Sequence, residues 1–248
     1  MNYCRLSAFI VVSMFIFVAT GCTPRSISNS GYPNSYQSRY DRDSDQNDFS
    51  YEGELTEFQI LGIDPKSMPS EGDIARALSQ SKNIKLSKNS KILLIQSGAA
   101  IPDEGMAKSL EKYFTVGPFS GKPQSDIKDE NYSRLIRLIA AKGGYETIVC
   151  YWGILESGKM NQATKTVSWV PIVGWSLPDQ KDLMRIRLKI ALLDVRTGSW
   201  EVFMPAPFAD SDYSAIANRK DVDQSLVQTL KEKAYVSAAS EVYSRFSL

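Results

Sequence analysis

The chain has 248 residues, with 29 lysines and arginines against 28 aspartates and glutamates, and it contains no histidine. The balanced charge argues against a nucleic-acid-binding protein, which needs an excess of cations facing phosphates. The absence of histidine excludes Ser-His-Asp and Cys-His catalysis and histidine-based zinc sites, whereas carboxylate pairs, Ser-Lys dyads and oxygen-ligand metal sites stay open.

The first 21 residues have the order of a bacterial secretory signal. Arg5 precedes an apolar run over residues 6–19, which is shorter than the roughly 20 residues of a membrane-spanning helix. The segment ends in Ala19-Thr20-Gly21-Cys22 and so resembles a lipoprotein signal. That resemblance implies a diacylglyceryl thioether on Cys22 and acyl chains such as palmitate; the alternative is a plain cleaved signal.

The residue after the cysteine bears on the predicted localisation of the protein. Many lipoproteins that stay at the inner membrane of Gram-negative bacteria have aspartate there, and this chain has Thr23. The resemblance therefore implies the periplasmic face of the outer membrane.

The composition then changes along the chain. We interpret residues 22–52 as the lipidated Cys22 and a flexible tether, because this polar stretch has too few aliphatic residues to bury. A coil of this length has a reach of about 30 Å. Its recurrent tyrosines could instead bind peptidoglycan or a partner, but we favour a spacer. Residues 53–248 are predicted to form one periplasmic domain, long enough for a single core.

Only one cysteine remains for that domain. Cys4 leaves with the signal and Cys22 takes the lipid, so Cys150 has no disulfide partner and the core alone must hold the fold. Cys150 lies between two apolar neighbours, and we interpret it as a buried packing thiol rather than a nucleophile.

The first half of the domain alternates helices and strands. A capping-box-like sequence at residues 70–73 begins a helix that carries Ile74, Ala77 and Leu78 on one face. Short apolar runs predict strands, and helical spacing or a glycine stop predicts helices. We expect strands over 91–96 and 115–119 and helices over 103–113 and 131–142.

The second half predicts an antiparallel extension. Residues 146–155 are nearly all apolar, as in a central strand covered on both faces. Residues 185–192 alternate with a period of two, and a turn at 196–199 leads into 200–204 as a hairpin. Residues 223–246 form a long amphipathic helix. This order predicts an α/β (α+β) domain with a single mixed sheet, packed helices and a long C-terminal helix.

Three stretches resemble a known periplasmic domain. They are residues 91–97 as a first core strand, residues 144–153 as a second, and the Thr-Gly hairpin over residues 193–200. They are similar to the α/β domain shared by the CsgG curli-secretion lipoprotein, LpoB-type activators of penicillin-binding proteins and the amino-terminal domain of TolB. The resemblance implies the fold and a habit of binding envelope proteins. It brings no catalytic residue, and nothing resembles the membrane-spanning hairpins of CsgG.

The preferred contact site is the hydrophobic connection over residues 167–177. It places Trp169, Ile172 and Trp175 in a segment that proline and glycine keep from forming a regular central strand. Exposed aromatic residues of this kind are typical of partner or membrane contacts. The alternative is an edge strand packed against the sheet.

Three polar motifs have simpler readings. Asp103 and Glu104 follow a core strand, where carboxylates could be catalytic, but acidic residues in a first helical turn also suit the helix dipole, and we prefer that. Residues 117–123 lack the spacing of a phosphate loop. Asp126, Asp129 and Glu130 lack the glycine turn of a calcium loop. We therefore predict no metal and no cofactor.

The expected function is binding rather than catalysis. We expect a membrane-anchored periplasmic lipoprotein that scaffolds or activates another component of the cell envelope. The partner would be an envelope protein and not a nucleic acid. The alternative is an envelope hydrolase, such as a peptidase that uses a Ser-Lys or carboxylate pair.

Overall fold

The computed structural model describes residues 24–29, 51–80, 83–124, 127–161, 164, 166–172, 183–209 and 221–247. Residues 1–23, with the predicted signal and Cys22, and residues 30–50 lie outside this set. Within it, no helix has the length and apolar character needed to cross a membrane. The helices are α1 (Glu57–Leu61), α2 (Glu71–Gln80), α3 (Glu104–Glu111), α4 (Asp129–Lys142) and α5 (Asp221–Phe246).

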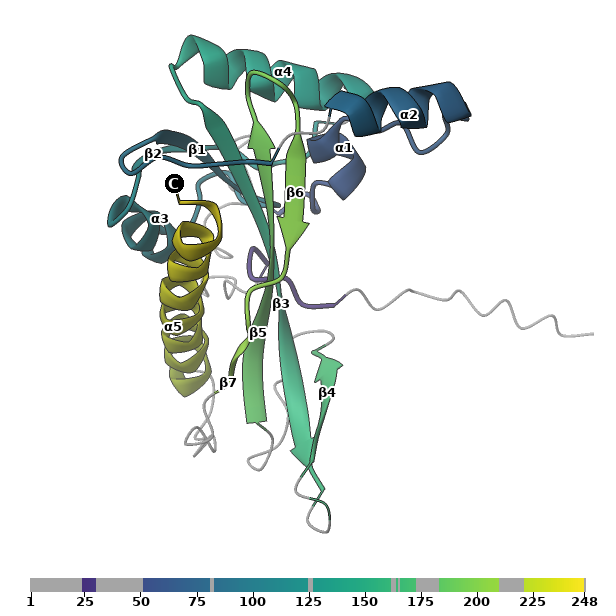
Figure 1. Ribbon diagram of the computed structural model, residues 1–248. Helices are drawn as coiled ribbons and strands as arrows, with labels where there is room; N and C mark the ends of the chain where they lie inside the picture. The colour runs from purple at the N-terminus through teal and green to yellow at the C-terminus, as the bar shows by residue number, and fades with distance from the viewer. Residues whose placement is uncertain are drawn as a thin grey trace, which may run out of the picture.

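The described strands form one mixed sheet, which confirms the predicted fold class (Figure 1). The order along it is β2-β1-β3-β5-β6, with β4 beside β3 and β7 beside β5. β1 pairs in parallel with β2 and β3, and the other pairs are antiparallel. The strands are β1 (Lys91–Gln96), β2 (Thr115–Phe119), β3 (Thr147–Met160), β4 (Val167–Pro171), β5 (Leu183–Asp194), β6 (Trp200–Phe203) and β7 (Phe208–Ala209).

Helices cover the two faces of this sheet. α3 and α5 contact each other on one face, over a core that includes Leu94 and Leu230. α1 and α4 contact each other on the opposite face, over a core that includes Leu93, Ile136 and Cys150. β1 thus sends successive side chains into different cores, which explains why its run is apolar throughout. Complete burial raises the pKa of the Cys150 thiol, as expected for a packing residue.

β3 is longer than its apolar run predicts. That run ends at Leu155, but the strand continues to Met160, because its outer half pairs with β4 on one side and with β5 on the other. The backbone of β3 thus keeps pairing beyond Leu155, where its apolar side chains end. The result is a long ribbon that extends beyond the helices (Figure 1).

Residues 24–29 pair with the sheet, although they fall within the stretch over residues 22–52 that is predicted to be a flexible tether. They fill the edge of β3 between β1 and β4: the N–H of Ile27 donates to the carbonyl of Gly153 (2.9 Å), and the N–H of Leu155 donates to that of Arg25 (3.0 Å). Ile27 is 1% exposed and lies in the core. One aliphatic side chain and the pairing with β3 fix a segment that is otherwise polar.

Candidate functional site

Residues 167–171 of the predicted contact segment form β4, which pairs with the outer half of β3. The guanidinium of Arg185 lies 4.1 Å from the ring centre of Trp169, which is half-buried on β4. Ile172 is 4% exposed and lies in the core, and the partner contact expected of it stays a prediction. Its N–H donates to Leu155 (2.8 Å) and its carbonyl accepts from Arg25 (2.7 Å), and these bonds hold it over the core. Trp175 lies outside the described residues.

A row of cations follows one side of β5. Arg185 Nε donates to Glu156 Oε2 at 2.7 Å, Arg187 donates to Oε1, and the Glu156 side chain has no exposed surface. Burial opposes ionisation of Glu156, but the hydrogen bonds from Arg187 and Arg185 outweigh it and hold the pKa of this carboxyl below its ordinary value. Lys189 continues the row and pairs with Glu57 of α1.

A cavity of about 600 Å³ lies beside this row, against residues 24–26 and 51–54. We call it the anchor-side cavity. Most of its lining is apolar, and its charged groups are Glu54, Arg187 and Lys189. The other lining residues are Pro24, Ser26, Tyr51, Gly53, Trp152, Gly153, Ile154, Leu188 and Met204.

Two charged groups of the anchor-side cavity have buried atoms without partners. The hydroxyl of Ser26 donates to Glu54 Oε1, but Glu54 Oε2 accepts no hydrogen bond from any described residue. The Nε of Arg187 is likewise buried, and it has no acceptor within the described set. Burial raises the pKa of Glu54, although the hydrogen bond from Ser26 acts in the opposite direction. The lining thus contains one acceptor and one donor still to be satisfied.

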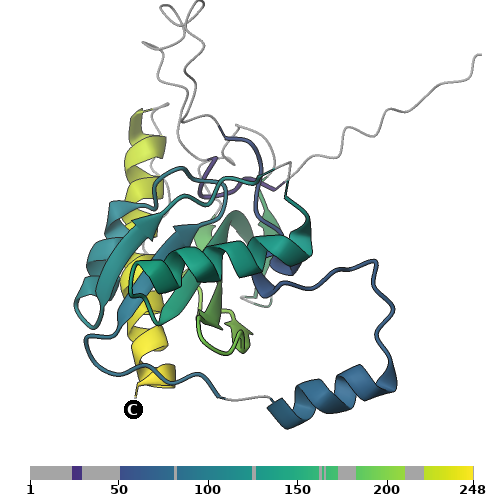
Figure 2. The same ribbon diagram turned by 90° about the horizontal axis from the view of Figure 1, so that it is seen from above.

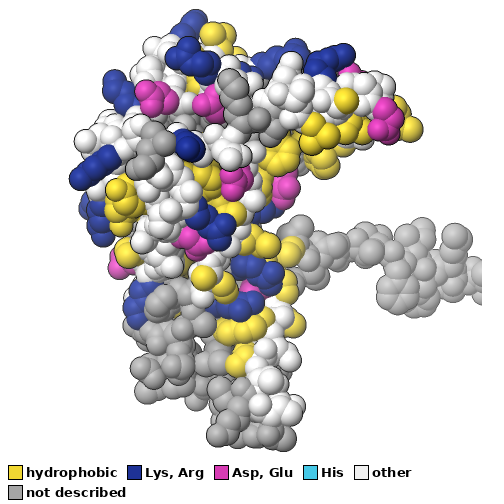
Figure 3. Space-filling model, in the orientation of Figure 1, with side chains coloured by type: hydrophobic (Ala, Val, Ile, Leu, Met, Phe, Trp, Pro, Cys, Tyr) yellow, Lys and Arg dark blue, Asp and Glu magenta, His cyan; other side chains and the backbone are white. Residues whose placement is uncertain are grey.

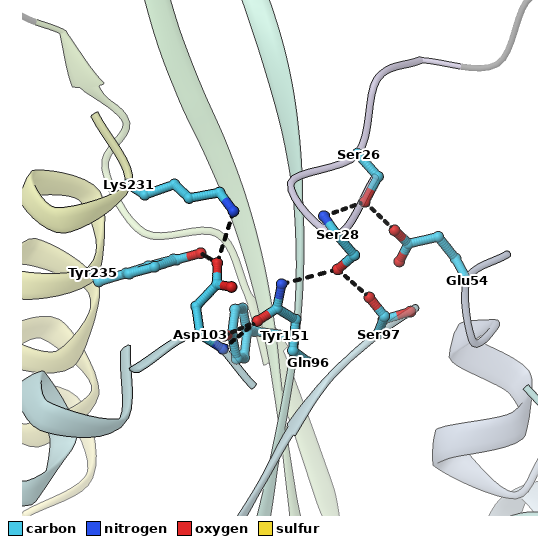
Figure 4. A network of polar contacts seen from close by, with 9 residues as sticks. All are labelled: Ser26, Ser28, Glu54, Gln96, Ser97, Asp103, Tyr151, Lys231 and Tyr235. Atoms are coloured by element: carbon cyan, nitrogen blue, oxygen red, sulfur yellow. Dashed lines mark hydrogen bonds and ion pairs between the residues drawn. The ribbon is translucent and has the colours of Figure 1, made fainter. Parts of the chain in front are cut away.

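Asp103 connects two helices rather than capping one. It precedes α3 without a side-chain capping bond, and its carboxylate accepts from Tyr235 (2.5 Å) and Lys231 (2.9 Å) of α5 (Figure 4). The exposed Glu104 pairs with Lys108 one turn later. The contacts of Asp103 and Glu104 are therefore those of structural ion pairs and hydrogen bonds.

The same network reaches the amino-terminal segment. Gln96 Oε1 accepts from the hydroxyl of Tyr151 and the N–H of Asp103, both at 2.6 Å, and its Nε2 donates to the hydroxyl of Ser28 at 3.0 Å. Ser28 in turn donates to the carbonyl of Ser97 (Figure 4). The carboxyl end of β1 thus joins α5 to residues 24–29.

The other polar motifs form no ligand site in the described structure. Lys122, in the loop that superficially suggested phosphate binding, pairs with Glu52 at 2.8 Å. Asp126 and the side chains of Asp129 and Glu130 lie outside the described residues. Among the side chains that are described, no group of three or more potential ligands gathers where a metal could bind.

Residues 63–80, which follow α1 and include α2, form an arm that stands away from the sheet (Figure 2). α2 has no buried residue, although the sequence gives it one apolar face. Met68, before the helix, is 96% exposed and Leu78 is 74% exposed. Hydrophobic side chains follow the underside of this arm, which faces a hollow (Figure 3). Its exposed large hydrophobic residues are Ile63, Met68, Ile74 and Leu78.

The residues of the anchor-side cavity were missed in the sequence because they come from segments far apart in the chain. One signal was present: the alternation over residues 185–192 places Arg185, Arg187 and Lys189 on one side of a strand. It predicts a polar face. It does not predict that Glu54 and Ser26 meet that face.

A family model described as YafT bacterial lipoprotein matches residues 56–245 of the chain. Among solved structures, the chain is similar to one described as "putative neuraminyllactose-binding hemagglutinin homolog from Helicobacter pylori". The two are 13% identical with a TM-score of 0.28, over 68% of this chain and 93% of that one. No curated protein matches the chain.

Proposed function

The chain belongs to the YafT family of bacterial lipoproteins, and from this premise we propose that it is a non-enzymatic binding component at the periplasmic face of the outer membrane. It would hold another envelope protein close to the bilayer. A lipid on Cys22 would anchor it, because two or more acyl chains make membrane binding durable. Anchoring restricts the domain to a thin layer and raises its effective concentration for a partner in that layer.

The exposed apolar face of α2 is the observation that carries this proposal. Ile74 and Leu78 lie one turn apart and are both exposed, and Met68 precedes them on the arm. An apolar patch of this kind on a monomer marks an interaction site. A partner that covers it would gain the burial of several large side chains at once.

The chemistry of α2 favours a protein partner over a lipid surface. Its first turn carries Glu71 and Asp73, and the cation of this helix, Arg76, pairs with Asp73 at 3.1 Å. Helices that lie on membranes have polar faces rich in lysine and arginine. In addition, α2 and residues 24–29, which follow the anchor, lie on opposite sides of α4 (Figure 2).

The likeness to the domain of CsgG, LpoB and TolB supports the same proposal. The stretches that carry it fall in β1, in β3 and at the β5–β6 hairpin, and β1, β3, β5 and β6 are neighbours in the sheet. By this resemblance we expect a role in binding envelope proteins. The surfaces that bind would differ, because the resemblance begins at about residue 90 and the arm precedes it.

Crosslinking in cells tests the proposal. A photo-reactive residue at Leu78 should crosslink to an envelope protein, whereas one at Arg76 should not, because residues two apart point to opposite sides of a helix. The crosslink should depend on Cys22 and be lost in the Cys22→Ala chain. The products are identified by mass spectrometry.

Substitution of the apolar face separates binding from folding. Ile74→Ser with Leu78→Ser should lower affinity for that partner at least about tenfold. The unfolding temperature should stay unchanged, because α2 contributes no buried residue to the core. Arg76→Ser is the matched control and should retain binding. A product made of two copies of this chain would contradict a hetero-partner, and turnover of peptides or muropeptides by the purified protein would favour the hydrolase.

A further inference from the structure

The anchor-side cavity is lined by a residue that lies close in the chain to the predicted lipid. Cys22 precedes Pro24 by two residues, and Pro24 lines the cavity. Two residues span at most about 7 Å, which is about the thickness of the headgroup layer on one side of a bilayer. When Cys22 is anchored, this cavity therefore lies beside the lipid headgroups.

The side chains of the cavity suit that depth. Met204 is 61% exposed at its rim, and a flexible thioether adapts to ligands of irregular shape. Tyr51 is also exposed there, and tyrosine favours the membrane interface, where its ring is apolar and its hydroxyl is hydrated. Trp152 and Leu188 supply apolar surface to the lining.

The charges of the cavity specify a headgroup. Arg187 has an unpartnered buried Nε, and Lys189 stands beside it on the same side of β5, so two cations can meet a phosphate. Glu54 Oε2 has no donor among the described residues, and burial raises the pKa of this carboxyl although Ser26 and the charge of Lys189 act in the opposite direction. A ligand ammonium would supply the missing donor and favour the ionised form.

We propose that the anchor-side cavity binds one phospholipid of the anchoring membrane whose headgroup carries an ammonium. An acyl chain lies in the apolar interior, the phosphate accepts from Arg187 and Lys189, and the ammonium donates to Glu54. This inference rests on the anchoring at Cys22 in the proposed function. It adds a second, non-covalent contact between the domain and its membrane.

Native mass spectrometry of the mature, lipidated chain in mild detergent tests this proposal. We expect one bound phospholipid, and after delipidation we expect phosphatidylethanolamine to rebind at least about tenfold more tightly than phosphatidylglycerol, the worth of one charge-assisted hydrogen bond. Glu54→Gln should abolish this preference and leave binding of both lipids at the phosphatidylglycerol level.

A matched pair of tryptophan substitutions controls for the cavity. Met204→Trp should fill it and remove both lipids, whereas Met68→Trp, at an exposed position outside the cavity, should leave binding and preference unchanged. Equal binding by the two variants, or an empty cavity in the mature chain, would overturn the proposal. A mass under denaturing conditions without covalent lipid would instead refute the anchor, and the crosslink from Leu78 reports the protein partner independently.

Discussion

A chain that begins at residue 50 should be less stable than one that begins at residue 23 by at least about 3 kcal/mol. The shorter chain loses the buried Ile27 side chain and the backbone bonds to Gly153 and Leu155. Removal of a buried isoleucine side chain alone costs about 2–5 kcal/mol. For a domain of this size the unfolding temperature should fall by about 6–12 °C, measured by circular dichroism and by urea unfolding.

Graded substitutions at Ile27 separate its packing from the rest of the segment. Ile27→Val should cost about 0.5–1.5 kcal/mol and Ile27→Ala about 2–5 kcal/mol, because the Ile27 side chain fills the space over Gly153. If the two chain lengths have the same free energy of unfolding, and Ile27→Ala leaves that free energy unchanged, the segment does not belong to the core.

Glu156→Gln should destabilise the protein by roughly 3 kcal/mol at neutral pH. Glu156 is the buried acceptor for two guanidinium groups, and removal of one partner from a buried pair leaves the other charges without compensation. Arg185 lies directly opposite it on β5, so the loss falls on the longest pairing of the sheet. Urea unfolding at pH 7 measures the difference.

The pH dependence gives this prediction a sign. The pKa of Glu156 is lowered in the folded state, so its contribution is present above its ordinary pKa, about 4, and is lost as the pH falls through the lowered folded value. The difference between wild type and Glu156→Gln should therefore shrink in acid. Glu201→Gln, at an exposed position on β6, is the control and should stay within about 0.5 kcal/mol at every pH. An equal loss in both variants would contradict the prediction.

The sheet could be predicted because local sequence patterns indicate its strands. β1 and the inner half of β3 are continuous apolar runs, and β5 alternates with a period of two. The pairing of residues 24–29 with the sheet could not be predicted, because a single isoleucine in a polar stretch gives no periodic pattern. What fixes them is the open edge of β3 and the room above Gly153, where an added Cβ would lie 2.8 Å from Ile27.

The site was harder to predict than the fold for a similar reason. Amphipathic spacing identifies the apolar face of α2, but the same spacing describes helices that pack and helices that do not. Trp169 and Ile172 are three residues apart, yet one is half-buried beside Arg185 and the other lies in the core. Their surroundings depend on β3 and on residues 24–29, which no local pattern connects to them.

The pairing of Ser26 with Ile154 sets the order in which the domain can assemble. The two residues lie far apart in the chain, and such non-local pairings form late in folding because a long loop must close first. Until then the edge of β3 between β1 and β4 presents unpaired amides to any neighbouring chain, which is the condition for edge-to-edge aggregation. With the lipid proposed on Cys22, two residues before Pro24, this edge would be protected at the membrane surface.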